Sequence, residues 1–422
     1  MTTIPVVQEQ GFTLDRRKAF GGLFIALGLV EIFVFGLRAS AGDAVFTFTL
    51  TGQAVNVPDL TLAPGPVCEG LGALSIVLGL AYAVFSLSKL PRDLVSGTVG
   101  IAFVVSFLCW ADAGLVPLPF VSLMQATVLA AIPLVLGALS GCLCERSGVI
   151  NIAIEGQLLL GAFGAAVIAS AFGSLWLGVV TGSLAGGLLA ALLAVFAIRY
   201  MVDQIIVGVV LNVFASGLTG YLYDEALVPY QNRLDSPNTF SPIKIPVLGD
   251  IPIIGPILFD STVFLYITYA MLVLVHIGLF KTRWGLRVRA VGEHPTAADT
   301  VGIRVLWTRY RNVILGGLVA GIGGASLTIG SVGSFGKDIS SGQGYIALAA
   351  MIFGRWTPLG ATGAALFFGF TLALANVLGT IGSPIPSDLL LMIPYVATIV
   401  AVTGFVGRGR PPRADGQPYV KA

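Results

Sequence analysis

Residues 119–143 read PFVSLMQATVLAAIPLVLGALSGCL and hold no charged side chain from the first position to the last. A helix that crosses a bilayer needs about 20 consecutive apolar residues. Similar runs recur at 19–37, 69–87, 94–117, 152–171, 174–198, 205–222, 257–280, 312–331, 344–356, 359–380 and 388–407. The pattern predicts an all-α polytopic membrane protein with about 10–12 spans. The run 344–356 is short and flanked by Gly, which predicts a half-helix or re-entrant segment.

The composition of the 422-residue chain also favours a membrane protein, because 56% of the residues are hydrophobic and 10% are charged. Soluble globular proteins carry about 25% charged residues, so an ordinary cytosolic enzyme and a disordered chain are excluded. An outer-membrane β-barrel would need short strands of alternating polarity, whereas these runs are long and apolar on every face.

The distribution of basic residues predicts the topology. If both termini lie inside, most of the 23 Lys and Arg residues fall on the inner side, seven of them from Lys281 to Arg311. Only four fall outside: Arg38, Arg233, Lys244 and Lys337. This asymmetry is typical of cytoplasmic loops. Arg16–Lys18 precede an apolar run longer than the h-region of a signal peptide, so we expect an uncleaved first span.

Three parts are predicted along the chain: N-terminal helices at 1–118, a helical core at 119–407 with the inside loop 281–311, and a cytoplasmic tail at 408–422. An extracytoplasmic hairpin is expected at 38–68. Apolar and polar residues alternate from Val45 to Leu50, and a second strand is expected from Val55 to Leu60.

The sequence lacks signatures of catalysis. Residues 333–338 resemble a phosphate-binding loop, but Ser331 stands where the motif needs Gly, and Asp338 where it needs Ser or Thr. The 4 Cys and 2 His residues show no metal-binding spacing. We therefore expect no catalytic residue, metal or cofactor in this chain.

Polar side chains inside apolar runs are candidates for a substrate pathway, because ionisable residues at membrane depth are costly and usually face the protein interior. Glu155 follows Asn151 by four residues, so both lie on one face of a helix, and Gln157 lies on the same turn. A structural hydrogen-bond knot, with Arg146 or a neighbouring helix as the partner of Glu155, is the alternative. Asn212 is a single amide that suits either a pathway or a link between helices.

A Gly-rich stretch from Gly330 to Gly344 is framed by Phe335, Gln343 and Tyr345. Broken helices at membrane depth must be buried or line a cavity, and transporters often place substrate sites there. An aromatic ring and an amide suit a flat, hydrogen-bonding solute such as a nucleobase. A plain extracytoplasmic loop is the alternative.

The inside loop 281–311 is predicted to contain a short exposed helix. Pro295 suits a first helical turn, Ala297 and Ala298 favour a helix with a small surface, and Gly302 can end it. Such a helix is suited to docking on a soluble partner. A solvated basic loop held by anionic lipid is the alternative.

Three motifs resemble those of ABC-importer permeases for simple sugars and nucleosides, a branched-chain-type permease family. They are ERSGVINIAIEGQ at 145–157, WGLRVRAVGEHPTAADTVGIRV at 284–305 and GQGYIALAAMIFG at 342–354, in the family order. The first motif resembles the nucleoside branch. His294 departs from the family pattern, which commonly has Asn at that position.

The resemblance implies an inner-membrane permease subunit of an ATP-driven importer in a bacterial cell, without an ATP site of its own. It implies a cytoplasmic ABC ATPase that binds ATP and Mg, a second permease subunit and an extracytoplasmic substrate-binding lipoprotein. Nucleosides, especially purine nucleosides, are favoured as solutes. A simple sugar is the alternative, and a secondary transporter would need a relay of ionisable groups that only Glu155 suggests.

The same resemblance implies which residues couple the permease to the ATPase. These residues are Gly292, Glu293, His294, Pro295, Ala297, Ala298, Gly302 and Ile303. No nucleic acid is expected as a partner, because the formal net charge is only +2.

Overall fold

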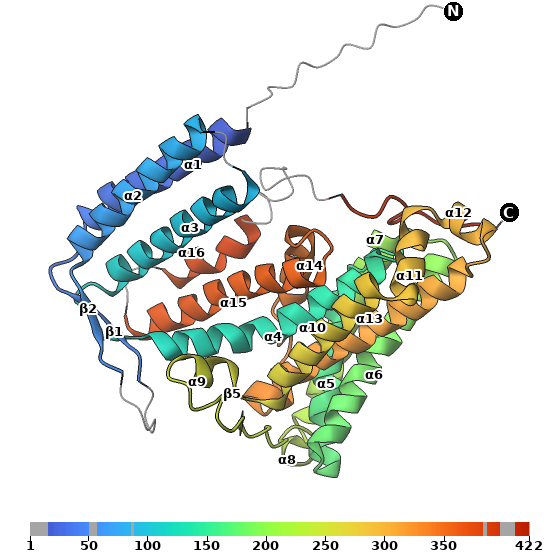
Figure 1. The fold of residues 1–422 in the computed structure, drawn as a ribbon. Coiled ribbons are helices and arrows are strands. Elements are labelled where there is room, and N and C mark those ends of the chain that lie inside the picture. The colour runs from blue at the N-terminus through green and yellow to red at the C-terminus, as the bar shows by residue number, and fades with distance from the viewer. Residues whose placement is uncertain (1–15, 50–56, 86–87, 383–385, 397–409, 422) are drawn as a thin grey trace, which may run out of the picture. The chain divides into compact units, whose positions relative to one another are not determined.

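The computed structural model describes residues 16–49, 57–85, 88–382, 386–396 and 410–421. Within these ranges, ten helices are long and apolar enough to cross a membrane, and Gln343–Phe353 is a shorter apolar helix. The chain is therefore an all-α polytopic membrane protein, as predicted. It divides into two compact units, 1–120 with 378–386 and 121–377 with 387–422 (Figure 1).

The helices of the first unit are α1 (Arg16–Val30), which continues as a π-helix over Glu31–Gly36, α2 (Pro64–Val84) and α3 (Lys89–Asp112). The backbones of α1 and α2 lie close together, since a Cβ atom on Gly28 would be 2.6 Å from the carbonyl oxygen of Gly72. Glu31 is fully buried there, and the Ser75 hydroxyl donates a hydrogen bond of 3.1 Å to its Oε2. This bond supplies the partner that a buried carboxyl group needs at membrane depth.

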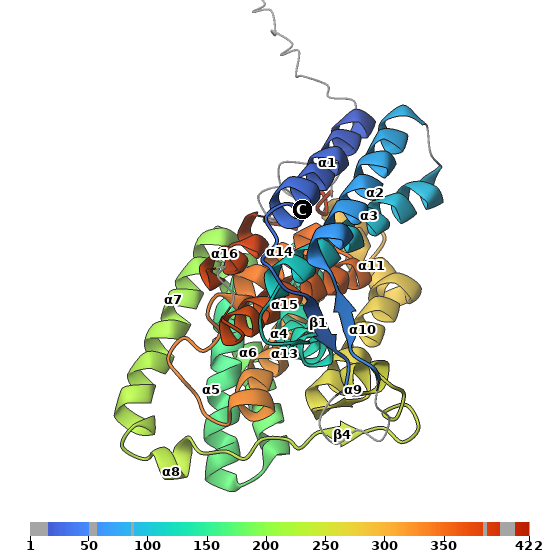
Figure 2. The same cartoon turned by 90° about the vertical axis from the view of Figure 1, so that its left-hand side faces the viewer.

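Short strands complete the first unit, and β1 is seen in Figure 2. β1 (Ala44–Thr47) pairs antiparallel with β2 (Leu60–Leu62) and parallel with β3 (Leu118–Pro119). The predicted hairpin is confirmed, but its second strand begins at Leu60, where Val55 was expected, and the sequence did not indicate β3. Residues 50–56 lie outside the described part of the chain.

The second unit contains the remaining elements. The long helices are α4 (Phe120–Glu145), α5 (Ile154–Phe172), α6 (Leu175–Ala194), α7 (Gln204–Leu222), α10 (Val263–Lys281), α13 (Val305–Leu327) and α15 (Pro358–Thr380). π-helical turns extend α6 over Val195–Arg199, α7 over Tyr223–Leu227 and α13 over Thr328–Val332. The short elements are α8 (Gln231–Leu234), β4 (Ile243–Lys244), α9 (Ile254–Leu258), β5 (Asp260–Ser261), α11 (Arg283–Glu293), α12 (Pro295–Thr300), α14 (Gln343–Phe353) and α16 (Ser387–Leu391). β4 and β5 pair antiparallel.

A GxxxG motif on α6, Gly182–Gly186, packs against a GxxxG motif on α13, Gly317–Gly321. A Cβ atom on Gly186 of α6 would lie 2.5 Å from the carbonyl oxygen of Gly317 on α13, and a Cβ atom on Gly182 would lie 2.7 Å from the carbonyl oxygen of Gly161 on α5. Helix association in lipid depends on such close packing, because the hydrophobic effect gives little preference for helix over lipid contacts. The absence of side chains at these positions therefore fixes α5, α6 and α13 as one bundle.

One predicted span differs clearly from the structure, and another falls mainly outside the described residues. The span predicted at 312–331 is α13, which begins seven residues earlier, at Val305, and includes Arg309 with 2% of its surface exposed. Hydropathy assigned Arg309 to the inside loop, because the partners that satisfy its charge lie far away in the sequence. The span predicted at 388–407 falls mainly on residues 397–409, which lie outside the described part of the chain.

The loops of the second unit gather at two ends of the bundle. The first, which we call the α12 end, brings together the loops 146–153, 200–203 and 282–304 and the tail, residues 410–421 (Figure 1). The Ile150 N–H donates to Gln204 Oε1 (2.7 Å), and the Ala414 N–H donates to the carbonyl oxygen of Gly292 (2.8 Å). These are the segments for which the sequence predicts a cytoplasmic position.

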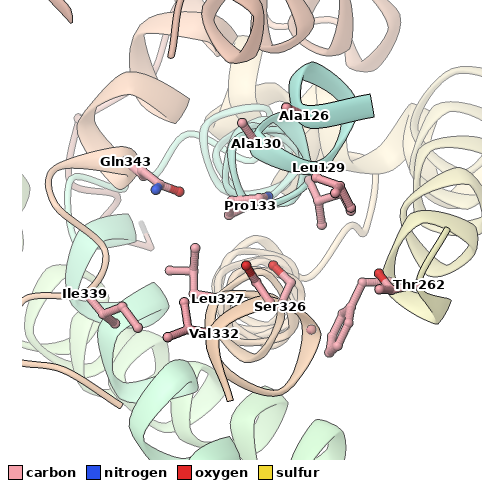
Figure 3. A pocket seen from close by; sticks show the side chains of 14 residues that line it. Ala126, Leu129, Ala130, Pro133, Thr262, Ser326, Leu327, Val332, Ile339 and Gln343 are labelled. Atoms are coloured by element: carbon pink, nitrogen blue, oxygen red, sulfur yellow. The ribbon is translucent and has the colours of Figure 1, made fainter. Parts of the chain in front are cut away.

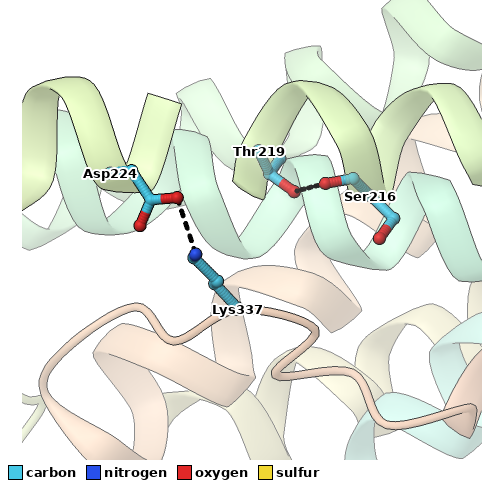
Figure 4. A network of polar contacts seen from close by, with 4 residues as sticks. All are labelled: Ser216, Thr219, Asp224 and Lys337. Carbon is cyan, nitrogen blue, oxygen red and sulfur yellow. Dashed lines mark hydrogen bonds and ion pairs between the residues drawn. The ribbon is translucent and has the colours of Figure 1, made fainter. Parts of the chain in front are cut away.

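The opposite end of the bundle carries α8, α9 and the long loop that precedes α14. Lys337 in this loop forms an ion pair of 2.7 Å with Asp224, just beyond α7 (Figure 4). The Ser216 hydroxyl donates to Asp338 beside it (2.7 Å). The stretch that resembled a phosphate-binding loop is thus tied to α7 by its own charged side chains.

Candidate functional site

A cavity of about 510 Å³ lies between α4, α13 and the start of α14 (Figure 3). Its wall combines apolar side chains of α4, such as Leu129 and Pro133, with the hydroxyl groups of Thr262, Ser326 and Ser331. None of the residues that line it is ionisable. The cavity can therefore surround a neutral solute and offer it hydrogen bonds.

Gln343 is the candidate residue that reaches this cavity (Figure 3). Its side-chain oxygen is buried and has no hydrogen-bond partner. An unpaired buried acceptor is costly, which makes this oxygen a ready partner for a donor on a bound solute. Pro133 adds to the polar wall, because its ring removes the N–H that would pair with the Leu129 carbonyl within α4.

Glu155 joins α5 to the first turn of α14. Its Oε1 accepts hydrogen bonds from the Ser340 hydroxyl (2.7 Å) and the Gly342 N–H (2.8 Å), and its Oε2 accepts from the Gly344 N–H (2.6 Å). A carboxylate at the N-terminus of a helix satisfies free N–H groups and complements the helix dipole. Arg146 is engaged elsewhere, since its Nε donates to the carbonyl oxygen of Trp356 (2.9 Å).

Asn212 connects α7 to the start of α5 and to α14. Its Oδ1 accepts from the Gly156 N–H (2.8 Å), and its Nδ2 donates to the carbonyl oxygen of Ile152 (2.9 Å) and to the Tyr345 hydroxyl (3.1 Å). Tyr345 remains partly exposed. Glu155 and Asn212, the latter through the Tyr345 hydroxyl, therefore both hold the first turn of α14, and we call these three residues the α14 anchor.

Asn151 and Gln157 form a second, fully buried pair. Their amides exchange two hydrogen bonds of 3.1 Å, and the Asn151 amide also donates to the Ser140 hydroxyl (3.3 Å). Each polar group finds its partner inside the bundle, as buried amides require. In this conformation the pair holds the loop before α5 against α4.

Phe335 packs away from the polar candidates. It is buried in an aromatic cluster with Phe163, at 5.2 Å between ring centroids, and Tyr223, at 6.1 Å. Its N–H donates to Asp235 (2.6 Å), and burial raises the pKa of that carboxyl group. Phe335 thus fixes the loop before α14, while Gln343 alone among the candidates lines the cavity.

The predicted short helix in the inside loop is present as α12. Pro295 occupies its first turn, and Gly302 follows its end with φ +83°, a backbone conformation that favours glycine. Ala297, Glu293, His294 and Gly302 are exposed, whereas Ala298 is 3% exposed and packs inward. The sequence predicted that both alanines belong to the docking surface of α12, but only Ala297 is exposed there.

Comparison with protein families matches residues 123–402 to the permease component of branched-chain amino acid transport systems. The chain belongs to this permease family. The match covers both the cavity and α12, and the permease is accordingly a multi-pass transport subunit of the inner membrane.

Individual relatives of the permease are similar over most of their length. The guanosine ABC transporter permease protein NupQ of Bacillus subtilis is 42% identical over 71% of this chain and 96% of its own. The nucleoside ABC transporter permease protein NupC of Lactococcus lactis is 40% identical over 69% and 94%. A putative glucose ABC transporter permease protein, TsgC13 of Haloferax volcanii, is 35% identical over 60% and 76%. No solved structure matches the chain.

The tail of the permease, residues 410–421, contributes contacts that sequence reasoning missed. Arg309 of α13 donates hydrogen bonds to the carbonyl oxygens of Gln417 (2.8 Å) and Ala414 (3.5 Å). Tyr419 is buried in a cluster with Val291, Ala298 and Val305. The tail therefore covers the inner face of α12. Arg309 was the one residue in the sequence that could have indicated these contacts with the tail. The sequence analysis counted it among the basic residues of the inside loop.

A carboxyl pair joins the tail to the end of α4. Asp415 is hydrogen-bonded to Glu145, at the end of α4, and lies near the Arg309 guanidinium. Burial raises the pKa of Asp415 to about 7, and the hydrogen bond to Glu145 and the charge of Arg309 limit this rise. Since two carboxylates in contact repel each other, a proton shared by this pair favours the docked tail.

Proposed function

We propose that this permease is a subunit of an ATP-driven importer of nucleosides, with purine nucleosides as the favoured solutes. The observation that carries the proposal is the cavity of about 510 Å³ with a wall of neutral hydrogen-bonding groups. Its volume falls in the range of about 300–1,000 Å³ that is usual for small-molecule sites.

The chemistry of a nucleoside suits this wall. A nucleoside is uncharged, its base has apolar faces and a hydrogen-bonding edge, and its ribose carries hydroxyl groups. Gln343 offers an unpaired amide oxygen, Ser326 and Thr262 offer hydroxyl groups, and Leu129 and Leu327 offer apolar surface. The names of the relatives in Bacillus subtilis and Lactococcus lactis support a nucleoside.

Import would be driven by a separate cytoplasmic ABC ATPase that docks on the exposed Ala297 of α12 and on the exposed Glu293 and His294 just before this helix. A second permease subunit would complete the pathway, and an extracytoplasmic lipoprotein would deliver the solute. ATP and Mg would bind to the ATPase. The bundle would alternate between outward and inward states, and each ligand would shift that equilibrium by its differential affinity.

A simple sugar is the second candidate, and the relative described as a glucose permease supports it. A sugar needs hydroxyl partners but gains little from flat apolar faces. A secondary transporter is disfavoured because the wall of the cavity holds no ionisable side chain.

Uptake separates these candidates. Cells that lack this chain, with and without a restored copy, would be supplied with labelled guanosine, cytidine, ribose or glucose. We expect guanosine uptake to return only with the restored copy and to stop when cellular ATP is depleted. Restored glucose or ribose uptake without nucleoside uptake would show that the permease imports a sugar. Nucleoside uptake driven by an ion gradient without ATP would overturn the ABC mechanism.

A further inference from the structure

A second, basic cleft of about 680 Å³ lies at the α12 end, between α11 and the first turns of α13. α11 contributes Trp284 and Arg287, and the other wall is Arg304 with the α13 residues Trp307 and Arg311. Positions 304, 307, 308 and 311 share one face of a helix because they are three or four residues apart. One wall of the cleft is thus formed by the first two turns of a membrane span.

The positive charge of this cleft has no acidic partner in the described chain. None of the residues that line it is acidic, and none of the ion pairs found in the described ranges involves Arg287, Arg304 or Arg311. The acidic residues nearest in sequence are engaged elsewhere: Glu293 accepts from the Arg413 N–H, and Asp299 is hydrogen-bonded to Tyr419. Three guanidinium groups are therefore available to an anion.

Two tryptophans give the cleft an amphipathic character. Trp284 stacks under the Arg311 guanidinium, 5.7 Å from the ring centroid, and its indole N–H is buried without an acceptor. Trp307 is 61% exposed in the first turn of the span. Leu286 and Val301 beside it are exposed as well. Tryptophan rings and basic side chains at a helix end are typical of the level of the lipid headgroups.

We propose that this cleft binds the headgroup of an anionic phospholipid. The phosphate oxygens would accept hydrogen bonds from the guanidinium groups of Arg287, Arg304 and Arg311 and from the Trp284 indole N–H. The acyl chains would lie along the exposed side chains of Trp307, Leu286 and Val301. Basic pockets of this kind, at the cytoplasmic ends of membrane spans, suit anionic headgroups. An acidic segment of the ATPase is the competing occupant, but the exposed apolar side chains around the cleft favour lipid.

The test uses the full chain in detergent micelles with dioleoylphosphatidylglycerol as the anionic probe and dioleoylphosphatidylcholine as the neutral one. We compare the triple variant R287Q/R304Q/R311Q with the control R199Q/R233Q/R283Q, which loses the same charge at exposed positions outside the cleft. Because each basic contact contributes about fivefold, the triple variant should bind phosphatidylglycerol on the order of 100-fold more weakly. The control should bind like the unchanged chain.

Each other outcome overturns the proposal. Equal loss of binding in both triple variants would show a general charge effect, and unchanged binding in the cleft variant would exclude the cleft. Displacement of the lipid by millimolar inorganic phosphate would identify a site for a free anion. Loss of ATPase binding with unchanged lipid binding would identify a protein-docking surface. If the triple variant fails to fold, the exposed single change R304Q serves instead and should weaken binding about fivefold.

Discussion

The Glu155 carboxylate on α5 lies 2.6 Å from the backbone nitrogen of Gly344, so this side chain ties the first turn of α14 to α5. A Cβ atom on Gly344 would collide with the backbone of Glu155, which shows how closely the two segments approach. α14 in turn carries Gln343 to the cavity. The position of Gln343 therefore depends on a capping carboxylate that another helix, α5, supplies.

Replacing Glu155 with Ala should destabilise the permease more than it alters the wall of the cavity. The change removes the acceptor of three hydrogen bonds, and a hydrogen bond to a charged group contributes about 1.5–3 kcal/mol. We expect a loss of about 2–4 kcal/mol of unfolding free energy, seen as a lower Tm in detergent. Glu155→Gln should retain part of this stability. An unchanged Tm together with abolished uptake would assign Glu155 to the pathway.

Replacing Gln343 with Ala should weaken solute recognition without unfolding the protein. The lost amide oxygen would contribute about 1 kcal/mol to a bound solute, which corresponds to a roughly fivefold higher KM for uptake. Gln231→Ala, at an exposed position of α8, is the matched control. Identical KM values for Gln343→Ala and the unchanged protein would remove Gln343 from the site.

Ala297 and Ala298 should respond differently to the same substitution. Ala297→Arg adds bulk to the exposed face of α12, so we expect normal folding and roughly tenfold slower uptake because docking of the ATPase is obstructed. Ala298→Arg would force a charge into the cluster beneath Tyr419 and should lower the Tm of the permease itself. Fluorescence-detected thermal unfolding and uptake, measured on both variants, distinguish the effects. Equal loss of Tm in both would argue against an outward docking face at Ala297.

Docking of the tail should weaken as the pH rises. The pKa of Asp415 is raised to about 7 in the docked tail, above the usual value of about 3.9. The docked state therefore holds its proton more tightly, and its extra stability is present at low pH and lost as the pH passes through about 7. Amide hydrogen exchange of residues 410–421, corrected for intrinsic rates, should be faster at pH 8 than at pH 6. The Asp415→Asn variant should show no such change, and a persistent one would rule out this carboxyl group as the cause.

Adding a methyl group to Gly186 should disrupt the bundle. Its Cβ atom would lie 2.5 Å from the carbonyl oxygen of Gly317, so α6 and α13 would have to separate. We expect Gly186→Ala to lower the Tm and the yield of folded protein. Gly217→Ala on α7 is the control, because nothing lies within 4 Å of that position, and it should behave like the unchanged chain. A neutral Gly186→Ala would show that this helix contact adapts freely.

Local sequence determined the spans, the short helix and its ends. Apolar runs specify helices in lipid because every backbone group must be paired within the segment, and Pro295 and Gly302 act through their own backbone preferences. The GxxxG motifs at Gly182–Gly186 and Gly317–Gly321 are also local features, because close helix packing needs only small residues one turn apart.

Tertiary structure alone decided which polar residues meet. Glu155 and Gly344 are 189 positions apart, and Arg309 finds its partners more than 100 positions further along, in the tail. From the sequence, Glu155 suited either a substrate pathway or a structural hydrogen-bond network, Arg309 suited a loop, and Ala298 suited an outward face. The partners of a buried charge are set by the packing of distant helices, and no pattern within a few turns of the chain encodes that packing.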